Sequence, residues 1–234
     1  MFRFKQFSVG QAGCAMKINT DGVLLGAMAA AEDAKTILDI GTGTGVLALM
    51  LAQRYTEAQI DAVEIDEAAA QTAGLNFKTS PFSERLAVYA MDFESYFDRF
   101  PERKYDLVVS NPPFYIDSLK SPGEKKTLAK HTDTAFFEKL VRGVSNHLTP
   151  GGSCWLILPG HIADIVAGFG KKLNLIPQKI IRVQSYESSQ AHRVILSLGF
   201  NKVQTSMSNF VIYEAEGIYS IEYRNLLQPY FLAF

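Results

Sequence analysis

The sequence TILDIGTGTG at residues 36–45 joins an apolar segment to three alternating glycines. Residues 36–40 have the length and apolar content of a buried strand, and residues 46–55 have the composition of a helix. Gly41, Gly43 and Gly45 lie between these two segments. Glycine can adopt positive φ and lets a ligand approach the backbone closely. A strand, a glycine-rich turn and a helix in this order predict a nucleotide-type binding site at the carboxyl edge of a parallel sheet.

The spacing of the glycines distinguishes two kinds of nucleotide site. The pyrophosphate-binding fingerprint GxGxxG requires a glycine where this chain has Val46. The pattern here is GxGxG, and no other redox group accompanies it. A nicotinamide-dependent oxidoreductase is therefore disfavoured.

Acidic side chains follow the next two predicted strands. Glu64 ends a strand at residues 60–65, about 20 residues beyond the glycines, where a carboxylate can accept hydrogen bonds from both ribose hydroxyls. Asp92 and Phe93 follow a third strand at residues 86–90, where the carboxylate and the ring could bind the amino edge and the face of an adenine. Asp92 could equally cap the next helix. Asp39, at the end of the first strand, could orient the glycine loop or face a cationic group of the ligand.

The rest of the chain continues the alternation of strands and helices. Further strands are predicted at residues 2–9, 105–110, 153–158, 179–183 and 192–198, and further helices at 20–31, 67–78, 136–148 and 162–173. Thr20 or Asp21 is the predicted N-cap of the first of these helices. A turn is expected at residues 150–152 and a flexible loop at 119–134. The pattern predicts a doubly wound α/β fold with helices on both faces of one sheet.

The sequence SNPPFY at residues 110–115 ends the strand at 105–110. Proline has no N–H group to extend a ladder, so the two prolines stop the strand pairing. They leave the amide of Asn111, backbone carbonyls and the rings of Phe114 and Tyr115 at the strand end. Hydrogen-bond acceptors beside a stacking surface suit a flat substrate that carries an amino group.

Composition and charge exclude several classes of protein. The 234 residues carry a net charge of −1, so any site for a polyanion must be a local patch. Cys14 and Cys154 have no CxxC partner, which argues against a zinc site or a disulfide framework and predicts two buried, reduced thiols. We expect no metal. Because neither a signal peptide nor a bilayer-spanning apolar run is seen, we expect no membrane association and a cytoplasmic location.

Together these motifs resemble the class I S-adenosylmethionine-dependent methyltransferases, in the branch that methylates planar nitrogens. The shared features are DIGTGTG at residues 39–45, Glu64, Asp92 and the tetrapeptide NPPF at residues 111–114, which is far more specific than the glycine loop. The resemblance implies a Rossmann-like sheet of seven mostly parallel strands with an antiparallel closing strand. It also implies S-adenosylmethionine as the cofactor and S-adenosylhomocysteine as its product.

A narrower resemblance extends over nearly the whole chain. Residues 4–7, 14–17, 20–26 and 218–219 are similar to the bacterial tRNA1(Val) adenine-N6 methyltransferases. This implies transfer of a methyl group to the exocyclic N6 of adenine 37, beside the anticodon of tRNA1(Val). Residues 1–234 would form a single methyltransferase domain. Residues 1–34 would be a short N-terminal extension that packs on the cofactor and substrate side.

The resemblance also implies roles for individual residues. Catalysis is expected from Asn111, Pro112, Pro113 and Phe114. Cofactor binding is expected from Asp39, Gly41, Gly43, Gly45, Glu64, Asp92, Thr20 and Asp21. The Asn111 side-chain oxygen and the Pro112 carbonyl would each accept one N–H of the target amine, and the Phe114 ring would stack on the base.

Contacts with the tRNA are expected from local basic side chains and from the ring that follows NPPF. Residues 171–202 contain six lysines and arginines and one acid, Glu187. Either phosphate contact or simple solvation explains such a surface. The residues expected to bind the substrate are Tyr115, Lys17, Lys171 and Lys172. We expect the enzyme to act as a monomer on the anticodon loop.

Alternatives remain open on this evidence. The family usually has tyrosine where this chain has Phe114, and phenylalanine is common there in guanine-N2 rRNA methyltransferases. Glutamine-amide protein methyltransferases share the NPP signature. Both groups usually carry an additional N-terminal domain, and we expect none here. A non-catalytic module that binds the cofactor or RNA is a further possibility.

Overall fold

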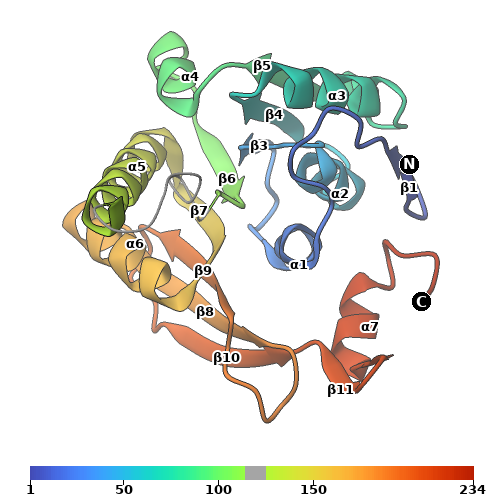
Figure 1. Ribbon diagram of the computed structural model, residues 1–234. Helices are drawn as coiled ribbons and strands as arrows, with labels where there is room; N and C mark the ends of the chain where they lie inside the picture. The colour runs from blue at the N-terminus through green and yellow to red at the C-terminus, as the bar shows by residue number, and fades with distance from the viewer. Residues whose placement is uncertain (114–124) are drawn as a thin grey trace.

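The computed structural model describes residues 1–113 and 125–234, with the side chains of residues 1–113 and 134–234 (Figure 1). Its centre is an eight-stranded sheet in the order β10-β8-β9-β7-β6-β3-β4-β5. The strands are β3 Thr36–Ile40, β4 Gln59–Glu64, β5 Leu86–Ala90, β6 Tyr105–Ser110, β7 Leu148–Leu158, β8 Ile176–Gln184, β9 Arg193–Gly199 and β10 Ser206–Val211. The doubly wound, mostly parallel α/β fold predicted from the sequence is confirmed.

Two details of the predicted sheet were wrong. The sheet has eight strands rather than seven, because β10 pairs in parallel with β8. The antiparallel strand β9 does not close the sheet, since it lies between β7 and β8 and is antiparallel to both. The sequence of β10, SMSNFV, does not predict a strand, because its first four residues are exposed and form no buried apolar run.

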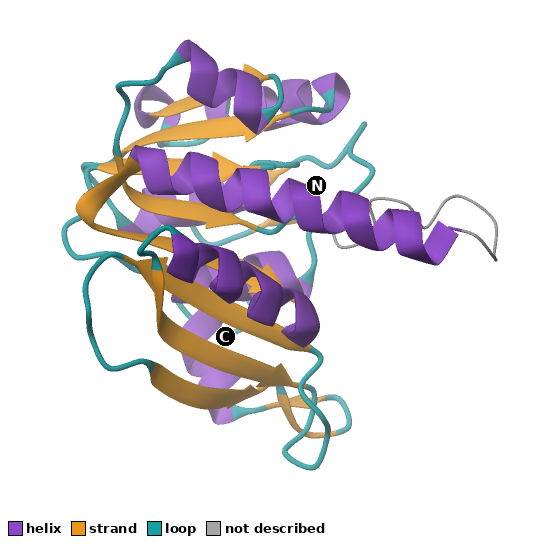
Figure 2. Cartoon of the chain, turned by 90° about the vertical axis from the view of Figure 1, so that its left-hand side faces the viewer, coloured by secondary structure: helices purple, strands orange, loops and turns teal. Residues whose placement is uncertain are grey.

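Helices cover both faces of this sheet. They are α1 Thr20–Met28, α2 Val46–Arg54, α3 Glu67–Lys78, α4 Phe93–Arg99, α5 Lys125–His147, α6 Gly160–Lys172 and α7 Ile221–Leu227. Figure 2 shows the long α5 beside α6 on one face of the sheet. Successive strand residues point to opposite faces. Accordingly Ile37 packs in a core with α1, α2 and α7, whereas Leu38 packs in a second core with α4, α5 and α6.

The N-terminal segment forms a small hairpin rather than one strand. It consists of β1 Phe2–Arg3 and β2 Ser8–Val9, which pair antiparallel. Phe4 forms an isolated bridge with Phe231, so the two ends of the described chain lie side by side (Figure 1). A second short hairpin, β11 Tyr213–Ala215 with β12 Ile218–Tyr219, leads into α7.

Two local features differ from the predictions: the N-cap of α1 and the turn at residues 150–152. Asn19, and neither Thr20 nor Asp21, caps α1, because the Asn19 side chain accepts the N–H of Gly22. The predicted turn at residues 150–152 is an irregularity inside β7: Tyr105 pairs with Leu148 but Leu107 pairs with Ser153. The intervening residues therefore form an extended bulge.

Helix α5 also begins earlier than predicted. It starts at Lys125 rather than at residue 136, so residues 125–134 of the loop expected at 119–134 are helical. The remainder of that loop lies outside the described residues. Within the described part of the chain, no helix combines the length and the apolar character needed to cross a membrane.

Candidate active site

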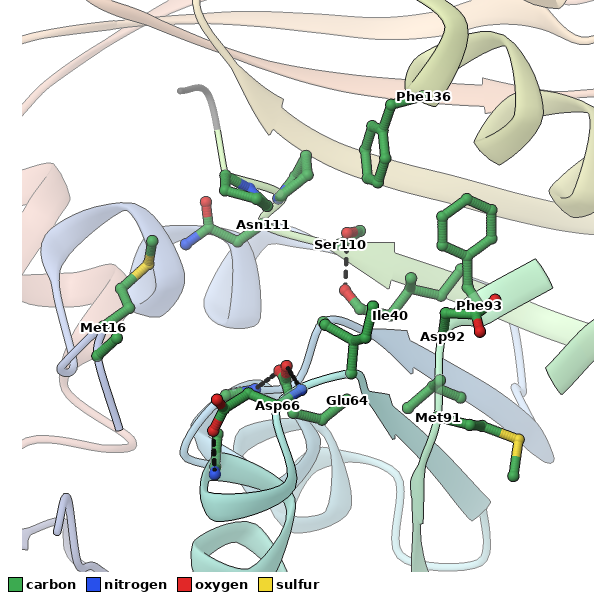
Figure 3. A pocket seen from close by; sticks show the side chains of 18 of the residues that line it. Met16, Ile40, Glu64, Asp66, Met91, Asp92, Phe93, Ser110, Asn111 and Phe136 are labelled. Atoms are coloured by element: carbon green, nitrogen blue, oxygen red, sulfur yellow. Dashed lines mark hydrogen bonds between the residues drawn. The ribbon is translucent and has the colours of Figure 1, made fainter. Parts of the chain in front are cut away.

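A cavity of about 560 Å³ opens at the carboxyl ends of four neighbouring parallel strands (Figure 3). Its wall is formed by the ends of β3, β4, β5 and β6 with the residues that follow them, by residues 14–16, and by Phe136 of α5. A ligand in such a position contacts loops that the sheet holds rigidly. The cavity therefore joins most of the motifs that the sequence contains.

The three glycines after β3 serve two different purposes. Gly41 and Gly43 line the cavity with φ of 73° and 57°, and an added Cβ at either would meet no atom within 4 Å. Their backbone is therefore open to a ligand. Gly45 has φ of 81°, but its Cβ would lie 2.5 Å from the ring of Phe77 on α3. Gly45 is thus required by packing and does not line the cavity.

Glu64 joins the glycine loop to the end of β4. Its Oε2 accepts the N–H of Gly43 at 2.8 Å, and its Oε1 accepts the N–H of Asp66 at 2.9 Å. Each carboxylate oxygen has a second lone pair, so both can still accept hydroxyl donors from the cavity. Asp66 also lines the cavity while its Oδ1 caps α3 through the N–H of Ala69.

Asp92 is a helix cap, as one reading of its sequence context predicts, and it also faces the cavity. It lines the cavity and also caps α4, since Oδ1 accepts the N–H of Ser95 at 2.8 Å and Oδ2 accepts the Ser95 hydroxyl at 2.7 Å. These two hydrogen bonds lower the pKa of Asp92 below its ordinary value; the bond from the Ser95 N–H has the larger effect and the bond from the Ser95 hydroxyl the smaller. The carboxylate is therefore charged and fixed in direction at this end of the cavity.

Asp39 lies behind the glycine loop rather than in the cavity wall. It is fully buried, and its Oδ2 accepts the Thr42 hydroxyl at 2.6 Å. Burial raises the pKa of Asp39 to about 7, with the hydrogen bond from Thr42 acting in the opposite direction. Of the two roles considered for Asp39, this placement supports orientation of the loop.

Asn111, Pro112 and Pro113 line the cavity directly after β6. The Ser110 hydroxyl donates to the Ile40 carbonyl at 2.7 Å and so ties the end of β6 to β3. The Asn111 side chain lies at the side of the cavity nearest Met16 (Figure 3). The expected stacking residues Phe114 and Tyr115 lie outside the described residues.

Thr20 and Asp21, which were expected to bind the cofactor, are not part of the cavity wall. Asp21 pairs with Arg193 at the start of β9, with Oδ2 2.7 Å from Nε. Thr20 is an exposed first residue of α1. Both remain close to the site, because the Asn111 Nδ2 lies 3.8 Å from the position of a Cβ added to Gly22.

The expected substrate-binding lysines separate into two places. Lys17 is exposed and follows the cavity residue Met16. Lys171 and Lys172 end α6, which starts next to the carboxyl end of β7 and runs back to the start of β8. They therefore lie toward the opposite edge of the sheet from the cavity. This placement does not support the expected role of Lys171 and Lys172 in substrate binding.

Phe93, whose ring the sequence suggests for the face of an adenine, lines the cavity beside Asp92. Two further cavity residues, Met91 and Ile65, had no predicted role, and Ile65 has 75% of its surface exposed. Their positions next to predicted acidic residues were the available signal. No sequence signal pointed to Phe136, because it reaches the cavity from the separate helix α5. Its ring packs edge-on against the Phe93 ring, with 5.5 Å between the ring centroids. The described residues contain no group of three or more His, Cys, Asp and Glu that could hold a metal ion.

Comparison with known proteins agrees with this arrangement. Residues 16–167 match the family described as the methyltransferase small domain. The chain is 47% identical over 233 residues to the tRNA1(Val) (adenine(37)-N6)-methyltransferase of Pedobacter heparinus, covering 100% of this chain and 98% of the relative. The protein of the same name from Bacteroides fragilis is 40% identical over 231 residues, covering 99% and 97%. The chain belongs to the tRNA1(Val) (adenine(37)-N6)-methyltransferase family.

Solved structures similar to this family member are more distant and support the fold alone. A predicted O-methyltransferase from Agrobacterium tumefaciens matches with a TM-score of 0.70 at 18% identity, covering 90% of this chain and 96% of that chain. A putative class I S-adenosylmethionine-dependent methyltransferase from Listeria monocytogenes matches with a TM-score of 0.58 at 16% identity, covering 94% and 71%. These matches confirm the α/β fold predicted from the sequence, whereas the predicted family resemblance is confirmed by the family match and the sequence relatives.

The two kinds of glycine in this family member predict different mutant phenotypes. Gly43→Ala should weaken S-adenosylhomocysteine binding at least about tenfold, because the methyl group would enter the cavity, at a cost in stability of about 1–2 kcal/mol. Gly45→Ala should cost about 2–4 kcal/mol, because the clash with Phe77 adds to the strain of positive φ. Calorimetric titration and chemical denaturation measure the two effects. Normal binding by Gly43→Ala would contradict the assignment of Gly43 to the cavity wall.

Asp39 predicts a specific pH dependence of stability. Below about pH 4 the carboxyl group is protonated in both folded and unfolded chains. Between pH 4 and 7 only the unfolded chain loses this proton, so the free energy of unfolding contributed by Asp39 falls as the pH rises toward its folded pKa of about 7. Asp39→Asn should remove this decline and be roughly 1–4 kcal/mol more stable than the wild type at pH 8. Parallel stability curves for the two proteins across pH 4–7, from urea denaturation, would rule this out.

Proposed function

We propose that this protein transfers a methyl group from S-adenosylmethionine to the exocyclic N6 of adenine 37 in tRNA1(Val). The observation that carries the proposal is the position of Asn111, Pro112 and Pro113 in the wall of the cavity, in a chain similar over its whole length to relatives named for this reaction. A tRNA substrate agrees with the cytoplasmic location expected from the sequence.

The cavity fits S-adenosylmethionine by the chemistry of its wall. Glu64 presents carboxylate oxygens suited to ribose hydroxyls, and the open backbone at Gly41 and Gly43 leaves room for the amino-acid portion of the cofactor. Asp92 with Met91 provides an acceptor and an apolar surface for an adenine ring. When bound, the cofactor supplies an electrophilic methyl group on a sulfonium sulfur.

The end of β6 can hold the amine that receives the methyl group. The lone pair of an adenine amine is delocalised into the ring, which makes the nitrogen a poor nucleophile. Acceptors at the Asn111 side chain and the Pro112 carbonyl would hold both N–H groups and favour the pyramidal form. Such acceptors act best when they are rigid, and the hydrogen bond from Ser110 to Ile40 fixes this strand end.

The target base must leave its stack to reach the cavity. An unpaired base of the anticodon loop requires little energy for this step. Lys17, exposed beside the cavity residue Met16, would contact a neighbouring phosphate. With a net charge of −1 on the chain, we expect the affinity for tRNA to depend strongly on salt.

The direct test uses an unmodified tRNA1(Val) transcript and S-adenosylmethionine labelled in the methyl group. Nucleoside mass analysis should find one N6-methyladenosine per transcript, and a transcript with guanosine at position 37 should stay unlabelled. N2-methylguanosine in the product would favour the guanine-N2 alternative. The absence of any methylated nucleoside, from protein that binds the cofactor, would overturn the proposed substrate.

Asn111 predicts a separation of catalysis from cofactor binding. Asn111→Ala should lower the rate of methyl transfer about 10²–10³-fold, because one preorganised acceptor is lost. The Kd for S-adenosylhomocysteine should change less than about threefold. Asn209→Ala, an exposed asparagine on β10, is the matched control and should leave both quantities unchanged. Unchanged turnover by Asn111→Ala would remove Asn111 from the mechanism.

A further inference from the structure

Asn76 on α3 joins two segments of the chain that border the cavity. Its Oδ1 accepts the N–H of Gly10 at 2.7 Å, and its Nδ2 donates to the carbonyls of Gly10 at 2.9 Å and of Thr44 at 2.8 Å. The Asn76 side chain is buried, at 6% exposure. One amide thus holds the N-terminal segment and the glycine loop in a fixed relation.

A second residue on the same face of α3 holds the same segment. Thr72, one turn before Asn76, donates its hydroxyl to the Ala12 carbonyl at 2.5 Å. Farther along, the Gln11 side chain accepts the N–H of Ile18 at 2.8 Å and closes the segment on itself. We call residues 10–17 the strap. Its residues Cys14, Ala15 and Met16 form one wall of the cavity.

The strap residues in the cavity wall are partly exposed to solvent. Cys14 is of intermediate exposure and Met16 is 49% exposed, whereas Gly13, with φ of 76°, makes a turn between the anchored part and the wall. Hydrogen bonds from α3 to Gly10 and Ala12 therefore set where the wall lies. Apolar packing of α3 on the glycine loop is supplied separately, by Phe77 against Gly45.

We propose that Asn76 is a positioning residue that fastens the strap to the glycine loop, so that the strap closes over bound S-adenosylmethionine and slows its release. Only a carboxamide meets the geometry, since the site asks for one acceptor and two donors from the same side chain. Aspartate would keep the acceptor but lose both donors. The inference rests on the proposed function, because it takes the cavity to be the cofactor site.

The rate at which the Cys14 thiol is labelled reports on the position of the strap without an activity measurement. Burial raises the pKa of the Cys14 thiol, and the other cysteine, Cys154, is 2% exposed with its pKa raised to about 12 by burial. N-ethylmaleimide should therefore label Cys14 selectively in the folded protein at pH 8. Bound S-adenosylhomocysteine should slow this labelling at least about fivefold if the strap closes on the ligand.

The variants are Asn76→Asp and Thr72→Val, with Asn209→Asp on the exposed strand β10 as a matched control. Asn76→Asp should raise the Kd for S-adenosylhomocysteine and the KM for S-adenosylmethionine about tenfold, with kcat and the KM for tRNA changed less than about threefold. It should also speed Cys14 labelling about tenfold and abolish the protection by ligand. Thr72→Val, which removes one partly exposed hydroxyl, should raise the same Kd and KM about threefold; affinity alone is compared for this variant, because Thr72 also hydrogen-bonds the Cys14 thiol. Asn209→Asp should show none of these changes.

The outcomes separate this inference from the proposed function. A wild-type protein that does not bind S-adenosylhomocysteine overturns the proposed function, and the strap with it. If the wild type binds the ligand while Cys14 labelling is unprotected, or while Asn76→Asp binds and reacts as the wild type does, the strap is overturned alone. Should Asn76→Asp fail to fold, Thr72→Val decides: wild-type affinity for S-adenosylhomocysteine in that variant contradicts the inference.

Discussion

The parallel pairing of β3 with β4 on one side and with β6 on the other is the constraint on which the site depends. Backbone hydrogen bonds in this pairing set Ile40 opposite Val63 and Ser110. The segments that follow the three strands therefore emerge at one edge of the sheet. Residues separated by some 70 positions in the sequence meet there, as the bond from Ser110 to Ile40 shows.

Most polar groups at this edge have partners within the protein, and this fixes their direction. Glu64 is held by the N–H groups of Gly43 and Asp66, and Asp92 is held by Ser95. Groups fixed in this way need no rearrangement when a ligand arrives, which reduces the entropy lost on binding. Part of this rigidity comes from the secondary structure itself, because Asp92 is the N-cap of α4 and the nearby Asp66 is the N-cap of α3.

Two helices connect the edge of the sheet to the remaining parts of the chain. On α3, Phe77 packs against Gly45 and Asn76 binds Gly10, so the glycine loop and the N-terminal segment share one support. On α1, Asp21 pairs with Arg193 of β9. In the sheet, β9 is separated from the central strand β3 by β7 and β6. The cavity is thereby tied to elements that contribute no residue to its wall.

The sequence by itself determined the fold class, the reaction type expected from resemblance, and the motifs at the ends of β3, β4, β5 and β6. These features are local, since a buried strand, a glycine turn and a proline-broken strand each leave a signature within a few residues. Only the tertiary structure decided how those motifs are used. It placed Gly45 against Phe77, Asp39 behind the loop, Asp21 against Arg193, and Lys171 with Lys172 toward the far edge of the sheet. It also brought in Phe136 and Asn76, whose roles depend on contacts between segments distant in sequence, and such contacts leave no local pattern.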